Sequence, residues 1–234
     1  MLKIAHRGYT KHHHDNSFGA FIAAYNRGFD MIELDIQLDK NDNIIIFHDE
    51  FIGNQYVRNM SFYDIHNLHP HAILLSTFFT YFNYTHIKLY FDLKGSKKLA
   101  YILHDFLQQN NIILDNIWFA SFNIQHLDVL VEKGGYKLGL ITDNIYNNEL
   151  LQLFIQKYDI KFVCFSWTVL DKDSVEYLKS KRVSTFIYTL KDHSILPIVQ
   201  EYNIDGIVSN IWFNNDTCEE YSKPILHHDL NYIL

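Results

Sequence analysis

The sequence predicts an α/β protein of the TIM-type (β/α)8 barrel class. Short apolar runs alternate with longer segments of helical pattern, which is typical of a parallel sheet with crossover helices. The runs are apolar at nearly every position, as expected for strands covered on both faces. Eight such units match a barrel in number and length. A doubly wound open sheet is the alternative, but no Gly-rich dinucleotide turn follows the first predicted strand.

The elements follow each other in a regular order. Strands are expected at 3–8, 31–37, 88–94, 116–121, 137–142, 162–167, 185–190 and 205–209. Helical patterns lie between them at 17–27, 97–110, 124–133, 148–158, 172–181 and 194–202. The chain has 234 residues and no obvious linker, so residues 1–234 are expected to form one domain.

One short turn breaks this alternation. Residues 37–43 are too few to hold a crossover helix, so the apolar run 44–48 is expected to return antiparallel to the strand before it. Such a hairpin would place His48 opposite Glu33. Glu33 and Asp35 are two residues apart and would share one face of their strand.

The stretch 50–87 is expected to be a small insertion after the second barrel strand. It contains a short helical pattern at 61–68, with Ser61 as its N-cap and Asp64 three residues later. A lid, a substrate-shaping loop and a passive excursion all remain open as its role.

The composition limits the classes of partner and location. Apolar residues make up 48% of the chain and charged residues 20%, so a sizeable core is expected. The net charge of −7 argues against nucleic acid or an anionic membrane as a broad partner. No apolar run is long enough to span a bilayer. The two cysteines, Cys164 and Cys218, lack a metal-type spacing and are expected as free thiols of a cytoplasmic protein.

Polar residues within apolar strands carry the functional prediction. His6, Glu33, Asp35 and His48 each ride on or end an apolar run, and Asp92 lies inside the next predicted barrel strand. A charge in such a place is costly unless something binds it. Three converging carboxylates suggest an oxygen-ligated Mg²⁺ or Ca²⁺ site, and two imidazoles beside it suggest acid–base chemistry. A barrel-rim ion pair is the structural alternative for the two carboxylates of one strand.

These motifs resemble those of the glycerophosphodiester phosphodiesterase family. Its hallmark is His-Arg-Gly, five residues and Pro-Glu-Asn-Thr, followed by Glu-x-Asp-Val and Val-x-Phe-His-Asp. The matching positions here are His6-Arg7-Gly8, His14-Asp15-Asn16-Ser17, Glu33-Leu34-Asp35-Ile36, Ile45-Ile46-Phe47-His48-Asp49, Asp92-Leu93-Lys94, Ser121-Phe122 and Ile204-Asp205-Gly206-Ile207-Val208. The resemblance spans nearly the whole chain and is most specific in its first 50 residues.

The resemblance implies a TIM barrel that hydrolyses small-molecule glycerophosphodiesters to glycerol phosphate and an alcohol, with one divalent cation, Mg²⁺ or Ca²⁺. It implies that the metal ligands are Glu33, Asp35 and Asp92. Asp15, which replaces a Glu of the family, would contact the metal or its waters.

It also implies roles for four further residues. His6 and His48 would be the acid–base pair, and Arg7 and Lys94 would bind the substrate phosphate. Stable membrane insertion is not expected, and no oligomeric state is predicted.

Two other functions remain open on the same residues. The first is a phospholipase D-like enzyme that acts on lysolipids or sphingolipids, which an exposed apolar loop at 77–84 would favour. The second is a barrel that binds without turnover, for which the shortened acids Asp15 and Asp92 are the only support. Three further departures concern the substrate wall and the last strand: Tyr188 stands where the family commonly has Trp, and Asn210 and Trp212 replace an Asp and a Pro.

Overall fold

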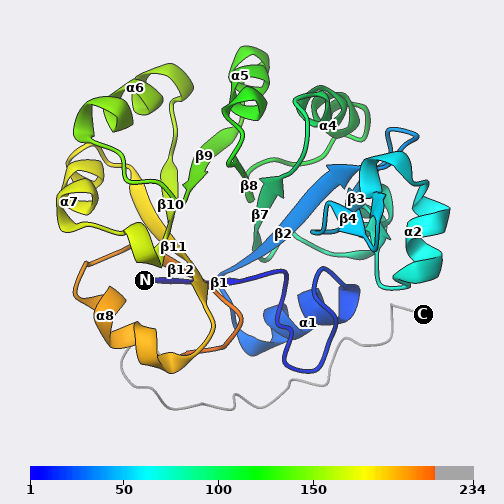
Figure 1. Cartoon of the computed structure of the whole chain (residues 1–234), viewed down its shortest axis with the longest axis horizontal. Helices are drawn as coiled ribbons and strands as arrows, with labels where there is room; N and C mark the ends of the chain where they lie inside the picture. Colours follow the sequence, from blue (N-terminus) through cyan, green and yellow to red (C-terminus); the bar gives the residue numbers. More distant parts are fainter. Residues whose placement is uncertain (214–234) are drawn as a thin grey trace.

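The computed structural model of the chain describes residues 1–213, which form a closed barrel of parallel strands (Figure 1). The barrel strands are β1 (Leu2–Ala5), β2 (Met31–Leu38), β7 (Lys88–Leu93), β8 (Ile117–Ser121), β9 (Lys137–Thr142), β10 (Phe162–Ser166), β11 (Ser184–Leu190) and β12 (Gly206–Ser209). The first strand closes the barrel because it pairs in parallel with both β12 and β2. The predicted fold class is confirmed.

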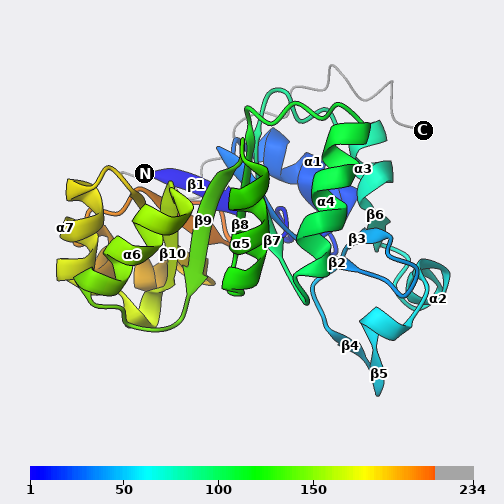
Figure 2. The same ribbon diagram turned by 90° about the horizontal axis from the view of Figure 1, so that it is seen from above.

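Helices lie around the outside of this barrel (Figures 1 and 2). They are α1 (Phe18–Arg27), α3 (Leu75–Tyr81), α4 (Lys98–Gln109), α5 (Ile124–Lys133), α6 (Asn148–Tyr158), α7 (Lys172–Ser180) and α8 (Leu196–Gln200). Several begin at a side chain that accepts a backbone N–H, including Ser17, Asn123, Asn147 and Asp171, which satisfies a donor that the helix itself leaves free. The predicted helix 194–202 is divided into a 3-10 turn, η3 (His193–Ile195), and the short α8.

The barrel interior is filled by side chains that alternate along the strands. Tyr90 and Phe162 belong to one buried cluster inside it, while a larger cluster lies between the strands and the surrounding helices. Small residues make room for large rings: a Cβ on Gly139 would stand 2.2 Å from the ring of Phe162. This packing fills the barrel below the polar residues at its mouth.

The predicted hairpin is present, with a different register. The short β3 (Ile44–Ile46) runs antiparallel to β2 and pairs Ile36 with Ile46. Continued, this register would set His48 against Leu34, so the expected pairing of His48 with Glu33 is wrong by one residue. The reason is that the turn centres on Asn41 itself, because the Asp39 N–H donates to the carbonyl of Asn43. His48 lies beyond the last paired residue of β3.

The stretch 50–87 contains two parts of different character. Its first part is the two-stranded hairpin β4 (Phe51–Ile52) and β5 (Gln55–Tyr56), the 3-10 turn η1 (Val57–Asn59) and the helix α2 (Phe62–Leu68), which project beside the barrel (Figure 2). Ser61 caps α2 in a capping box with Asp64, as the sequence predicts. Val57, Met60 and Ile65 form a small core of their own with Ile45 of β3 and with Phe47.

The second part returns to the barrel. After β6 (Ile73–Leu74), helix α3 packs Leu75 and Phe78 into the main core, and the ring of Phe78 meets the ring of Phe21 edge-on at 5.4 Å. Residues 77–84 are therefore not an exposed apolar loop at the mouth. Their phenylalanines are covered because α3 occupies the crossover between β2 and β7, and the observation that would favour a lysolipid substrate is absent.

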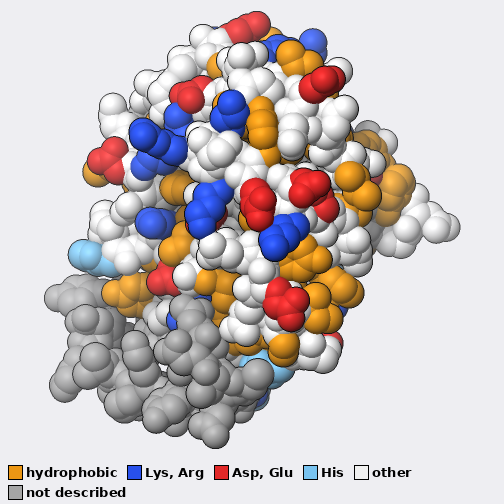
Figure 3. Space-filling view, turned by 90° about the vertical axis from the view of Figure 1, so that its left-hand side faces the viewer, with side chains coloured by type: hydrophobic (Ala, Val, Ile, Leu, Met, Phe, Trp, Pro, Cys, Tyr) orange, Lys and Arg blue, Asp and Glu red, His pale blue; other side chains and the backbone are white. Residues whose placement is uncertain are grey.

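The described part of the chain offers no helix with the length and apolar character needed to cross a bilayer. On the face shown in Figure 3, Lys and Arg side chains lie interspersed with Asp and Glu side chains. Cys164 is buried and free, whereas Cys218 lies outside the described residues.

Candidate active site

The polar residues singled out in the sequence gather at one end of the barrel. His6 and Arg7 follow β1, Glu33 and Asp35 lie on β2, and Asp92 lies on β7. Asp35 and Asp92 are direct neighbours in the parallel ladder between these two strands. This end carries the carboxyl termini of the strands, where barrel proteins place their active sites.

Three buried carboxylates form the centre of this site. Glu33, Asp35 and Asp92 each offer an oxygen, and these oxygens lie within 4.8 Å of one another. Burial raises the pKa of Glu33 well above its usual value, and the two neighbouring aspartates raise it further. Burial likewise raises the pKa of Asp92, to about 7, although the Lys94 ammonium opposes this. The site therefore holds more negative charge than its surroundings stabilise without a cation.

Two cations already lie against the acidic group. The Lys94 Nζ is 2.5 Å from Asp92 Oδ2 and 3.2 Å from Asp35 Oδ1. The Arg7 Nε is 3.2 Å from Asp35 Oδ2. Burial would raise the pKa of Asp35, but Lys94 and then Arg7 outweigh it and hold that pKa below its usual value. Asp35 is thus the carboxylate that remains ionised most readily.

Backbone and amide groups fix the carboxylates in place. The Arg7 N–H donates to Glu33 Oε2 over 2.8 Å. The Asn16 amide donates to Asp35 Oδ2 over 2.9 Å, and its oxygen accepts the Asp35 N–H over 3.2 Å. Asn16 is buried, while its neighbour Ser17 caps α1. The sequence analysis predicted no contact between Asn16 and the carboxylates.

His6 occupies a buried position beside the acidic group. Its Nδ1 lies 2.5 Å from Asn210 Oδ1. An amide oxygen only accepts, so Nδ1 carries the proton and Nε2 presents a lone pair. Burial, and then the neighbouring Arg7, lower the pKa of His6 to about 4, against the opposing effects of Asp35 and Asn210. Its imidazole is therefore neutral at pH 7.

His48 has a different environment. Its side chain is 35% exposed, and its Nδ1 lies 2.8 Å from the carboxylate of Asp49. It lines a cavity of about 180 Å³ together with Asp15, Asn16, Phe47, Asp49, His69 and His71. Two chain segments thus meet beside His48, the first loop and the stretch after α2.

Asp15 does not reach the carboxylates in this structure. It is paired instead with Arg7, whose Nη1 lies 3.1 Å from Asp15 Oδ2, and its side chain is 43% exposed. Asp15 thereby holds the guanidinium that also contacts Asp35.

The acidic group fits a hard divalent cation. All three donors are carboxylates, which Mg²⁺ and Ca²⁺ prefer. Among residues 1–213, the buried Asp92 Oδ1 finds no hydrogen-bond partner, although an unpartnered buried carboxylate oxygen is costly. A cation held by Glu33, Asp35 and Asp92 would use that oxygen and balance the excess charge.

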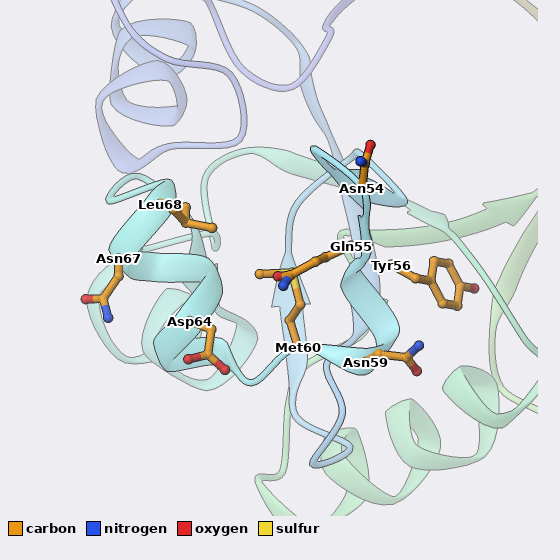
Figure 4. Close-up of a pocket in the computed structure, with 8 residues that line it drawn as sticks. All are labelled: Asn54, Gln55, Tyr56, Asn59, Met60, Asp64, Asn67 and Leu68. Atoms are coloured by element: carbon orange, nitrogen blue, oxygen red, sulfur yellow. The ribbon is translucent and has the colours of Figure 1, made fainter.

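A larger cavity lies away from these residues. It measures about 730 Å³ and is formed between β5, η1 and α2. Gln55 and Met60 extend toward α2 across it, whereas Tyr56 points away (Figure 4). Its one carboxylate, Asp64, is already used in the capping box of α2. The cavity offers no group for acid–base or metal chemistry.

The fold is a closed α/β barrel, and a buried acidic group lies at the carboxyl ends of its strands. These two features together define the protein as an α/β barrel with a candidate metal centre. Residues 6–211 match the model of the glycerophosphoryl diester phosphodiesterase family. Since this match covers most of the chain, the chain belongs to that family.

Curated relatives match over shorter segments. A glycerophosphodiester phosphodiesterase of Caldanaerobacter subterraneus subsp. tengcongensis is 38% identical over 72 residues, which are 29% of this chain and 30% of the relative. One of Bacillus altitudinis is 45% identical over 51 residues, 21% of each protein. The aligned segments thus span less than a third of these relatives.

Solved structures match over nearly the whole barrel. A glycerophosphodiester phosphodiesterase from Thermotoga maritima has a TM-score of 0.75 at 22% identity, covering 90% of this chain and 94% of that one. An Oleispira antarctica phosphodiesterase in complex with the product sn-glycerol-3-phosphate has a TM-score of 0.80 at 17% identity, covering 90% and 93%. At these identities the likeness shows the fold.

We expect Mg²⁺ to bind more weakly as the pH is lowered from about 8 to about 6. The raised pKa values of Glu33 and Asp92 mean that protons compete with the cation, roughly tenfold for each pH unit and displaced proton. Calorimetric titrations at several pH values measure this. Asp92→Asn removes one competing proton and should make the dependence shallower; an affinity independent of pH would contradict the electrostatic picture.

We expect Asn210→Asp to raise the pKa of His6 by at least about one unit, because a carboxylate that faces Nδ1–H stabilises the imidazolium. The imidazole signals of the variant and the wild type, followed by NMR through a pH titration, report this directly. Asn210→Ala is the control, since it removes the acceptor without adding charge and leaves the buried ring uncharged. A His6 pKa that is the same with Asp as with Asn would exclude the contact.

Proposed function

We propose that this protein is a metal-dependent phosphodiesterase that hydrolyses glycerophosphodiesters to glycerol phosphate and a free alcohol. One observation carries the proposal: the buried group of Glu33, Asp35 and Asp92 lies beside two cationic side chains and near two histidines of different environment. Family membership supports the same activity.

In the proposed mechanism, Glu33, Asp35 and Asp92 would hold Mg²⁺ or Ca²⁺, which when bound would supply Lewis-acid stabilisation of the negative charge that develops on the phosphate. The Arg7 guanidinium binds phosphate oxygens in a fork, and the Lys94 ammonium adds a point charge. In the structure, Arg7 pairs with Asp35 and Lys94 pairs with Asp92. When substrate binds, each cation would donate some of its hydrogen bonds to the phosphate instead. They attract an anion locally despite the net charge of −7.

The two histidines are proposed to transfer protons in opposite directions. His6, neutral and with its Nε2 lone pair available, accepts a proton from the attacking nucleophile, which is either water or a hydroxyl of the substrate. His48, whose Nδ1 lies 2.8 Å from the Asp49 carboxylate, donates a proton to the departing alkoxide. Asp15 assists by holding Arg7.

A lysolipid or sphingolipid substrate for a phospholipase D-like reaction remains the alternative with related chemistry. The cavity beside His48 holds about 180 Å³, which favours a small alcohol over an acyl chain. A barrel that binds without turnover is disfavoured, because the carboxylates, imidazoles and cations of the site are all present. The cytoplasmic location stays a prediction of the sequence.

The first test is product analysis. The purified protein with Mg²⁺ or Ca²⁺ should release glycerol phosphate from at least one of glycerophosphocholine, glycerophosphoethanolamine and glycerophosphoinositol, and EDTA should abolish the release. Chromatography or an enzyme-coupled assay of both products measures it. Turnover of lysolipids alone would favour the alternative enzyme, and no turnover of any diester with either metal would leave only the binding protein.

The second test separates the histidines from the fold. His6→Ala and His48→Ala should each lower kcat by roughly 10²- to 10⁴-fold, the usual contribution of a general acid or base. His104→Ala is the matched control, since His104 lies on α4 and bonds the hydroxyl of Tyr136 outside the barrel. Thermal melting checks that all three variants fold. Full activity in either site variant would exclude that residue from proton transfer.

A further inference from the structure

The turn that carries Lys94 is held by side chains from the next strand and helix. Lys94 follows β7, and residues 94–96 form the turn before α4. The carbonyl oxygens of Leu93, Gly95 and Ser96 each accept a hydrogen bond from the segment 121–126, which joins β8 to α5. These two strand–helix units are neighbours in the barrel (Figure 1). The geometry of this turn is therefore fixed by contacts that do not involve the carboxylates.

His126 is the buried centre of this set of contacts. Its side chain is fully buried on α5, with Nε2 2.9 Å from the Ser96 oxygen and Nδ1 2.8 Å from Ser121 Oγ. A carbonyl only accepts, so Nε2 carries the proton and Nδ1 can accept from the hydroxyl. The Ser121 hydroxyl lies equally close, at 2.8 Å, to the Leu93 oxygen, so its single proton serves one of the two at a time.

His126 takes no part in the proton transfers proposed above. Burial lowers its pKa, the hydrogen bond to Ser96 acts in the opposite direction, and no carboxylate contributes. It is therefore a neutral ring whose two nitrogens are both occupied by the turn and by Ser121. A buried histidine used in this way fixes backbone position.

Two neighbours on the same segment extend the contact to Lys94 itself. Asn123 donates its amide to the Gly95 oxygen over 3.1 Å, while its own oxygen caps α5. The ring of Phe122 lies 5.4 Å from Lys94 Nζ, within the range of a cation–π interaction. The segment thus holds the backbone on both sides of Lys94 and contacts its ammonium.

We propose that His126 is a positioning residue that, with Ser121 and Asn123, holds the Lys94 turn so that the ammonium points at the acidic group and at a bound phosphate. The inference rests on the proposed function, because it concerns the phosphate contact of Lys94. Lys94 is a long, flexible side chain, and a fixed turn reduces the freedom that it loses when it binds an anion.

A double-mutant cycle tests the proposal. His126→Leu keeps an apolar volume but leaves Ser96 without its donor, so it should raise KM and the Kd of inorganic phosphate in the presence of Mg²⁺ by about tenfold, a typical coupling within one hydrogen-bond network. His126→Gln retains a donor for Ser96 and should recover most of the affinity. In a Lys94→Ala background, His126→Leu should change either constant less than about twofold.

Asn123→Ser keeps a cap for α5 but is too short to donate a hydrogen bond to the Gly95 oxygen. Because Asn123 is only partly buried, this variant provides a second cycle with Lys94→Ala if His126→Leu does not fold. His104→Leu is the matched control, a histidine of α4 that bonds Tyr136 away from the turn, and should alter neither constant. The inference is overturned if the wild type turns over diesters but the effects of His126 or Asn123 variants and Lys94→Ala simply add. Absence of turnover in the wild type would instead overturn the proposed function itself.

Discussion

The crowding of three carboxylates at one mouth of the barrel is the constraint on which the rest of the site depends. Glu33, Asp35 and Asp92 lie too close together and too far from water to be ionised at once without help. The surrounding residues respond to that charge: Lys94 and Arg7 approach it, and Asn16 donates to it. A chain that folds to this arrangement carries the excess negative charge of a candidate cation site in the fold itself.

The fold could be predicted because the barrel strands are covered on both faces. Such strands are apolar at nearly every position, so the sequence predicts where they lie. The strand Lys137–Thr142, for example, begins and ends where predicted. The apolar pattern did not predict the register of the hairpin at Asn41 or the position of α3. Both depend on tertiary contacts, namely the closure of a five-residue turn and the edge-on contact of Phe78 with Phe21, which the apolar pattern alone does not specify.

The candidate site was predictable in its charged members and less so in its amides. A carboxylate or histidine inside an apolar run is conspicuous because burying it is costly. Asn16 and Asn210 carry no such signal, since asparagine after a strand is ordinary turn composition. Their contacts with Asp35 and His6 join residues far apart in the chain and become visible only when the barrel is closed. Asp15 is the opposite case. Its residue type suggested a contact with the metal or its waters, whereas in the structure its carboxylate pairs with Arg7.

The sequence motifs do not distinguish the two histidines, His6 and His48. Their hydrogen-bond partners in the structure do. Asn210 faces His6 with a neutral oxygen, whereas Asp49 faces His48 with a charged one. The neutral partner fixes the tautomer of His6 without stabilising its imidazolium. His6 is also enclosed, and burial lowers its pKa, whereas the His48 side chain is 35% exposed. The difference between the two histidines therefore follows from their partners, Asn210 after the last barrel strand and Asp49 next to His48 in the chain.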